Sequence, residues 1–135
     1  MLVFFGFCIH NLYMYVDCLY ICPMGAPKLL KGTLKTIILS LLEDKDRMYG
    51  YEITQKVKLL SDGEFKLTEG ALYPALHKME AEGLLETSTE LVDGRVRKYY
   101  SLSKSGELEV KTKLSEAELF IEKLQQVLNL KPSSI

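Results

Sequence analysis

Two short runs of strand-forming residues, 84–91 and 96–102, are joined by the tetrapeptide Val92-Asp93-Gly94-Arg95. Asp-Gly between two such runs strongly indicates a β-hairpin, because the tight turn needs positive φ angles that these residues tolerate. On both sides of this segment the apolar residues recur at helical spacing instead. The hairpin therefore restricts the chain to a mainly α fold with one small β-hairpin.

Three helices are predicted before the hairpin. Apolar residues at steps of three and four predict the first over about 28–43 and the second over about 51–60. Thr68 is a suitable N-cap for the third helix, and Pro74 removes one backbone donor and predicts a distorted first turn. The buried stripe of this helix is expected to comprise Leu72, Leu76 and Met79. Three short helices followed by a hairpin describe a winged helix-turn-helix.

The longest predicted helix covers about 104–128 and follows Ser103, a favourable N-cap. Its apolar residues step by four, three, four, three and four, which makes a heptad seam. The seam comprises Val110, Leu114, Ala117, Ile121, Leu124 and Leu128. We expect two chains to pair through it as a coiled-coil-like homodimer. The predicted organisation is a winged helix-turn-helix domain at 24–103, a dimerisation helix at 104–130 and a tail at 131–135.

The 135-residue chain carries 17 basic and 18 acidic residues, so its net charge is −1. Bulk positive charge therefore cannot carry nucleic-acid binding, and the basic residues must be placed locally. The hairpin offers such a place, because Arg95, Arg97 and Lys98 follow its turn and suit phosphate contact. Arg95 and Arg97 alternate along the strand and should share one face. The alternative is that these basic residues form a charged surface of the hairpin that contacts only solvent.

In helix-turn-helix proteins the second helix of the motif enters the major groove, and here that is the third helix. Its polar or open positions are the candidate DNA contacts, namely Thr68, Gly70, Tyr73, His77 and Lys78. Gly70 lets a backbone approach closely. The alternatives are half-buried packing for Tyr73 and a plain surface position for His77. Tyr51, at the start of the preceding helix, could place its hydroxyl on a phosphate or cover the core.

Residues 1–23 differ sharply from the rest of the chain. They contain all three cysteines, a single charged residue, Asp17, and no Lys or Arg. The three cysteines lack the paired spacing of a zinc site, and three is an odd number for disulfides. We expect this apolar extension to lie outside the fold, with translation starting at Met24. A membrane segment and a docked N-terminal element are the alternatives.

No residue pattern points to catalysis or to a cofactor. The sequence offers no nucleophile paired with a base, no phosphate-binding loop and no metal-ligand spacing. We therefore expect a cytoplasmic protein that binds double-stranded DNA, without enzymatic activity, cofactor or metal. Two other classes stay open: a winged-helix protein-interaction module, and a membrane-tethered regulator that uses residues 1–23.

One series of sequence blocks spans about 29–106. Its members are Leu29-Leu30-Lys31-Gly32-Thr33-Leu34, Tyr49-Gly50-Tyr51-Glu52-Ile53, Thr68-Glu69-Gly70-Ala71-Leu72-Tyr73-Pro74-Ala75-Leu76, Met79-Glu80-Ala81-Glu82-Gly83-Leu84-Leu85, Gly94-Arg95 with Arg97-Lys98-Tyr99-Tyr100, and Leu102-Ser103-Lys104-Ser105-Gly106. In this order the blocks resemble the PadR family of bacterial transcriptional regulators. The resemblance implies a dimeric winged-helix regulator of the compact branch, usually a repressor of a nearby operon.

The resemblance also bears on geometry and on effectors. Two chains paired through their last helices would place two recognition helices about one DNA turn, roughly 34 Å, apart on a palindromic operator. Some compact members of the family bind flat aromatic effectors in a pore at the dimer interface, often with a Trp. This chain contains no Trp, so the resemblance does not carry that pore over, and a small-molecule effector stays an open partner.

Overall fold

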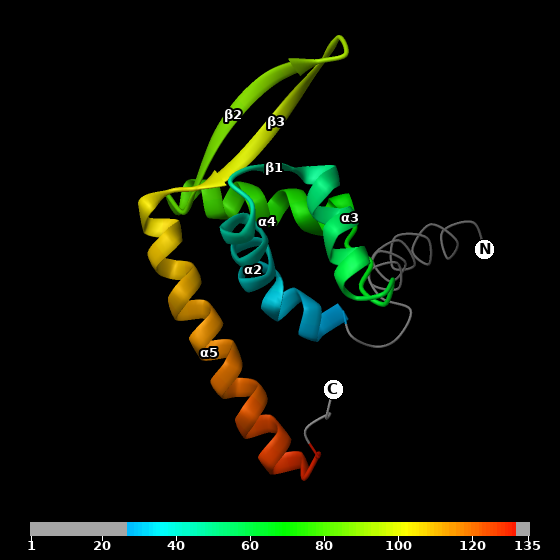
Figure 1. The fold of residues 1–135 in the computed structure, drawn as a ribbon, viewed down its shortest axis with the longest axis vertical. Coiled ribbons are helices and arrows are strands. Elements are labelled where there is room, and N and C mark those ends of the chain that lie inside the picture. The colour runs from blue at the N-terminus through cyan, green and yellow to red at the C-terminus, as the bar shows by residue number, and fades with distance from the viewer. Residues whose placement is uncertain (1–26, 132–135) are drawn as a thin grey trace, which may run out of the picture.

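The computed structural model describes residues 27–131, so the expectations for residues 1–23 lie outside the described residues. The elements are α2 Pro27–Asp44, β1 Met48–Tyr49, α3 Gly50–Leu60, α4 Glu69–Ala81, β2 Leu85–Val92, β3 Arg95–Leu102 and α5 Lys104–Leu128. In Figure 1, α2, α3 and α4 cluster below the β2–β3 hairpin, and α5 runs away from them as an arm. The predicted mainly α fold with a small hairpin is confirmed.

Three helices and the base of the sheet share one hydrophobic core. Ile38 of α2, Ile53 of α3 and Tyr100 of β3 are among its largest fully buried side chains. The predicted stripe of α4 is confirmed, because Leu72, Leu76 and Met79 are all buried in the same cluster. Burying a side chain of this size stabilises the fold by about 1.5–3 kcal/mol. The core therefore fixes which face of α4 points outward.

The sheet is larger than the sequence predicted. It has three antiparallel strands in the order β1-β3-β2, so the expectation of a two-stranded hairpin missed β1. The short strand pairs Met48 with Tyr100 and Tyr49 with Tyr99. Two residues are too few to show an alternating pattern, which explains the omission. The turn itself is confirmed, because Asp93 and Gly94 have positive φ angles of 51° and 74°.

The amino terminus of α4 differs from the expectation in one detail. Thr68 is the N-cap residue, but its side chain makes no capping hydrogen bond. The N–H of Ala71, a usual target of such a cap, instead donates to the Thr68 carbonyl at 3.2 Å. Pro74 lies inside the helix without ending it, and the chain leaves α4 through Gly83, whose φ is +75°.

The first turns of α5 pack tightly on the domain. The predicted cap is confirmed, because the Ser103 side chain accepts a hydrogen bond from the Gly106 N–H. A Cβ at Gly106 would lie 2.2 Å from the Leu84 carbonyl oxygen, so only glycine fits there. Val110 is fully buried in the core of its own chain. The assignment of Val110 to a seam between two chains is therefore corrected, because the residue already packs inside one protomer.

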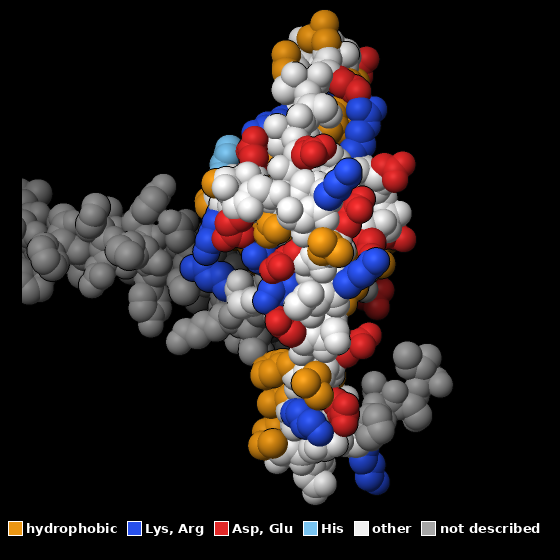
Figure 2. Space-filling model, turned by 90° about the vertical axis from the view of Figure 1, so that its left-hand side faces the viewer, with side chains coloured by type: hydrophobic (Ala, Val, Ile, Leu, Met, Phe, Trp, Pro, Cys, Tyr) orange, Lys and Arg blue, Asp and Glu red, His pale blue; other side chains and the backbone are white. Residues whose placement is uncertain are grey.

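Leu114 is still half-buried against the core, whereas the later part of α5 is largely exposed within residues 27–131. Figure 2 shows apolar side chains gathered on the lower part of the molecule, along this helix. The exposed apolar residues of this part are Leu119, Phe120, Ile121, Leu124, Val127, Leu128 and Leu130. Within residues 27–131 no helix is both long enough and apolar enough to cross a membrane.

Candidate nucleic-acid interface

One face of α4 is buried and the opposite face is open. Gly70, His77 and Lys78 are exposed there. A Cβ at Gly70 would meet nothing within 4 Å, so another molecule can approach this part of the helix backbone closely. The major groove of DNA is about 12 Å wide and admits one α-helix, so an exposed helix face can enter it. These three predicted site residues therefore share one accessible surface.

Tyr73 and Thr68 are less open than the other predicted residues of α4. Tyr73 is 37% exposed, and its ring lies against Gly50 at the start of α3. A Cβ at Gly50 would lie 2.7 Å from the Tyr73 hydroxyl oxygen, so a larger residue there would displace the Tyr73 ring. Thr68 is half-buried. Tyr73 thus joins the two helices of the motif and still presents part of its ring outward.

Glu80 connects α4 to the hairpin, and the sequence analysis did not single it out. Its Oε2 lies 3.0 Å from Nζ of Lys98, and its Oε1 accepts a hydrogen bond from the Thr87 hydroxyl at 3.2 Å. The hydrogen bond from Lys98 lowers the pKa of Glu80, and the same bond raises the pKa of Lys98. Nδ1 of His77 lies 3.9 Å from Glu80 Oε2. Lys98 therefore fastens the hairpin to α4.

The two faces of the sheet carry different parts of the predicted site. Alternate residues of a strand point to opposite faces, and Tyr100 faces the core. Lys98 is two residues from Tyr100 and lies on that same face, toward α4. Arg95 and Arg97 have the other parity in a regular register and share the outer face, as the alternation predicted. The three basic residues of the hairpin are therefore split between its faces.

Tyrosines and arginines interleave on the outer face of the sheet. We call this group the outer-face cluster, and it comprises Arg47, Tyr49, Tyr51, Glu90, Arg97 and Tyr99. The Arg97 guanidinium lies over the Tyr49 ring, 4.8 Å from its centroid, and Arg47 lies over Tyr99 at 4.7 Å. Tyr49 meets the Tyr99 ring edge-on at 5.7 Å. These contacts join β3 to the segment that leads into α3.

Two further contacts complete the outer-face cluster. Tyr51 stacks on Tyr49 with 6.5 Å between centroids and 22° between planes. Arg47 forms an ion pair and hydrogen bond with Glu90, which raises the pKa of Arg47. Tyr51 and Arg97, which the sequence proposed separately, are therefore linked through Tyr49. Arg47 and Glu90 were missed, because Arg47 sits in a charge run that reads as a solvated helix exit.

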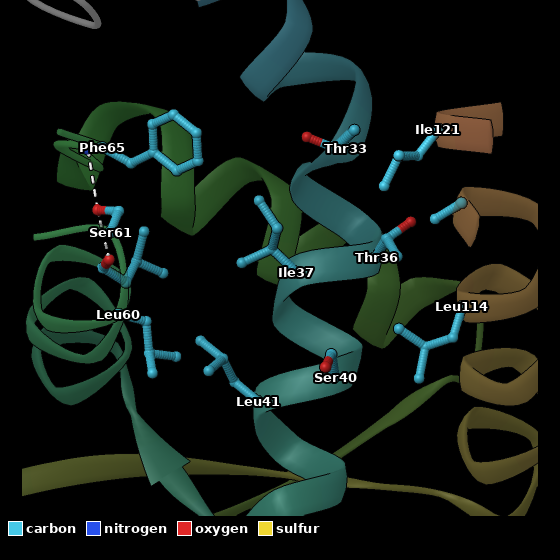
Figure 3. Close-up of a pocket in the computed structure, with 12 residues that line it drawn as sticks. Thr33, Thr36, Ile37, Ser40, Leu41, Leu60, Ser61, Phe65, Leu114 and Ile121 are labelled. Atoms are coloured by element: carbon cyan, nitrogen blue, oxygen red, sulfur yellow. Dashed lines mark hydrogen bonds between the residues drawn. The ribbon is translucent and has the colours of Figure 1, made fainter. Parts of the chain in front are cut away.

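A second accessible feature is an apolar groove between α2, the end of α3 and α5. Figure 3 shows Ile37 and Leu41 of α2, Leu60 and Phe65 near the end of α3, and Leu114 and Ile121 of α5 around it. The groove has a volume of about 440 Å³. Ser61 shapes its far wall, because its hydroxyl accepts from the Phe65 N–H at 2.9 Å. Among the described residues, no cluster of three potential metal ligands occurs.

A three-helix motif with an outward recognition helix and a projecting hairpin defines a winged helix-turn-helix regulator of the DNA-binding class. The model of the transcriptional regulator PadR-like family matches residues 38–112. The chain belongs to this family, whose members are transcriptional regulators rather than enzymes. It is a DNA-binding transcription regulator.

Two of the three relatives reported next are named as transcriptional regulators. The chain is 35% identical over 79 residues to an uncharacterized protein from Lysinibacillus sphaericus, covering 58% of this chain and 72% of the relative. It is 38% identical over 61 residues to a transcriptional regulator of Mycobacterium tuberculosis, covering 45% of this chain and 54% of that protein. A solved transcriptional regulator from Clostridium thermocellum superposes with a TM-score of 0.67 at 29% identity, covering 73% of this chain and 93% of that structure.

Proposed function

We propose that this regulator is a repressor that binds a palindromic operator as a homodimer. The observation that carries the proposal is the exposed face of α4, where Gly70, His77 and Lys78 lie opposite a fully buried stripe. Gly70 allows the helix backbone to approach the groove, and Lys78 and His77 can contact base edges or phosphates. Thr68, Tyr73 and Tyr51 belong to the same proposed interface. Occupying a promoter in this way blocks transcription.

The hairpin acts as a wing in this proposal. Arg95 and Arg97 contact the phosphates beside the groove that α4 enters, where they fix the register of the protein. Lys98 stands apart from these two, because its ammonium group is bound to Glu80. Its part in the interface is to hold the wing at a fixed angle to α4.

Dimerisation supplies the second half of the operator contact. The proposed seam consists of Leu114, Ala117, Ile121, Leu124 and Leu128. Leu114 already packs partly against the core of its own chain, and the seam is exposed from Ile121 onward. Exposed apolar patches of this kind favour protein association, since monomers rarely leave them in water. Pairing two arms would set the two α4 helices about one DNA turn, roughly 34 Å, apart.

A small-molecule effector fits the same arrangement. The apolar groove borders α5, so a ligand bound there can favour one angle of the arm over another. Such a ligand would lower DNA affinity if it bound more tightly to the arm angle that fits DNA poorly. The size of the effect is limited by the difference between its affinities for the two arm angles. An apolar ligand suits the groove, because most of the labelled side chains around it in Figure 3 are aliphatic or aromatic.

A mobility-shift titration with the DNA upstream of the protein's own gene tests the recognition helix. Lys78→Ala and Gly70→Ala should each weaken specific binding, and Gly70→Ala should do so without loss of stability because its new methyl group meets open space. Lys111→Ala on the exposed side of α5 is the matched control for Lys78→Ala. If both α4 variants bind like the native protein, α4 is not the recognition helix.

Salt dependence tests the wing. The Arg95→Ala/Arg97→Ala variant should weaken binding to all sequences and reduce the slope of log affinity against log salt by up to about one unit per phosphate contact. An unchanged slope would remove the wing from the interface. Transcription from the same promoter in a purified system should fall as native protein is added. A rise would show that the protein does not act as a repressor.

A further inference from the structure

Three charged side chains meet on the outer face of the sheet, and their pairing is not the one that the strand register suggests. Glu90 of β2 lies directly opposite Arg97 of β3. Side chains in such cross-strand positions have Cβ atoms about 4.5–5.5 Å apart, and opposite charges there attract. The Glu90 carboxylate nevertheless pairs with Arg47, which precedes β1. Within residues 27–131 no carboxylate pairs with Arg97, whose guanidinium rests on Tyr49.

We propose that Arg47 is a positioning residue that holds Glu90 away from Arg97 and so keeps Arg97 available to a DNA phosphate. The inference rests on the proposed function, in which Arg97 contacts the DNA backbone. A carboxylate and a phosphate compete for the same guanidinium, because both accept its paired N–H donors in the same planar geometry. Arg47 binds the carboxylate of Glu90, which would otherwise compete with the phosphate for Arg97.

The aromatic rings make this division of partners specific. Arg47 lies over Tyr99 and Arg97 lies over Tyr49, while the two rings meet edge to face. A guanidinium stacked on a ring keeps its N–H donors in the plane, where they remain open to an anion. The rings thus hold the two arginines at separate sites. Glu90 pairs with Arg47, whereas the half-buried Arg97 pairs with no carboxylate within residues 27–131.

Removing Arg47 should therefore act on DNA binding through Glu90. In Arg47→Ala the carboxylate is released, pairs with the opposite Arg97 and withdraws one phosphate contact. We expect the salt slope to fall by about 0.9 units, the value for one phosphate, as in Arg97→Ala. The double variant Arg47→Ala/Arg97→Ala should lose no more slope than Arg97→Ala alone. Arg47 has a half-exposed side chain, so its truncation opens no cavity in the core.

Glu90→Gln is the decisive second change. In the Arg47→Ala background it should restore the salt slope, because the neutral amide no longer competes for Arg97. Glu86→Gln is the matched control, since Glu86 is exposed on the same strand and face and loses the same charge. A general charge effect would make the two Gln variants equal in both backgrounds. The proposal requires rescue by Glu90→Gln only.

Each result decides the question. A native salt slope in Arg47→Ala would overturn the proposal. A reduced slope that Glu90→Gln does not restore would show that Arg47 itself contacts a phosphate, which also overturns it. A native slope in Arg97→Ala would mean that the wing assignment of the proposed function has failed first. Thermal unfolding of each variant, followed by circular dichroism, confirms that the compared proteins are folded.

Discussion

The two halves of α5 carry one apolar repeat but lie in opposite surroundings. In the first half Gly106 and Val110 are buried against the chain's own core, and Val110 is 0% exposed. In the second half Ile121 of the same repeat is 54% exposed. A heptad pattern therefore predicts that a helix face will be covered, and it does not predict whether the cover comes from the same chain or from another.

The difference follows from where the domain ends. α5 begins against the segment before β2 and packs against α2, and its side chains Val110 and Leu114 reach the core. Farther along, the helix extends past the domain, as Figure 1 shows. Its apolar side chains there are largely exposed within residues 27–131. Substitutions in the two halves should consequently have different effects, and measuring both separates folding of the protomer from assembly.

Val110→Asp should have the largest effect. A carboxylate at this fully buried position has no partner, and burying an unpaired charge costs several kcal/mol, which is of the order of a domain's whole stability. We expect the variant to be unfolded or nearly so at every protein concentration, measured by circular dichroism. Val110→Ala, a milder change at the same site, should stay folded with reduced stability. A native-like Val110→Asp protein would mean that α5 does not belong to the core.

Ile121→Asp should dissociate the proposed dimer and leave the protomer folded. Placing one charge from each chain in the proposed seam should cost about 3 kcal/mol or more, which corresponds to roughly a hundredfold weaker association. Sedimentation velocity over a concentration series measures this. Gln126→Asp introduces the same side chain away from the apolar stripe and should keep the native association. A tight dimer of the Ile121→Asp protein would place the interface elsewhere.

Gly106→Ala sharpens the comparison within the buried half. Its new Cβ would lie 2.2 Å from the Leu84 carbonyl oxygen, so the helix start or the strand must shift. We expect a loss of about 1–3 kcal/mol in unfolding free energy by denaturant titration, typical of overpacking. Gly70→Ala on α4 is the control, because its Cβ meets open space and alanine favours the helix. Equal losses at both glycines would contradict the close contact at Gly106.

Much of this fold was predictable because its strongest signals are local. Helical spacing, the Asp93-Gly94 turn and the Ser103 cap each act within a few residues, and the structure confirms them. The strand β1 was not predictable, since two residues carry no period and their partner is distant in sequence. Val110 was misassigned because the periodicity of a helix contains no information on which neighbour covers it.

The sequence was sufficient to predict several residues of the candidate site, but not the contacts that these residues make with one another. The sequence placed Gly70, His77 and Lys78 on one surface of a helix, and their exposure agrees with that. It grouped Lys98 with Arg95 and Arg97, whereas alternation along β3 puts Lys98 on the other face, bound to Glu80. Contacts such as this join separate elements, so they depend on the register of the sheet and on its packing against α4.

Ser103→Ala should have a smaller effect than the three changes above and concerns the anchored end of α5. The Ser103 hydroxyl donates to the Gly83 carbonyl at 2.6 Å and accepts from the Gly106 N–H at 3.1 Å. Losing such a cap costs about 1 kcal/mol, measured as unfolding free energy at one fixed protein concentration, since association adds to stability. At the other end, Asn129 has a left-handed φ of 53° that glycine adopts readily, so Asn129→Gly should leave stability nearly unchanged. A larger loss at Asn129 than at Ser103 would reverse the comparison, because it would place the stabilising end of α5 away from the domain.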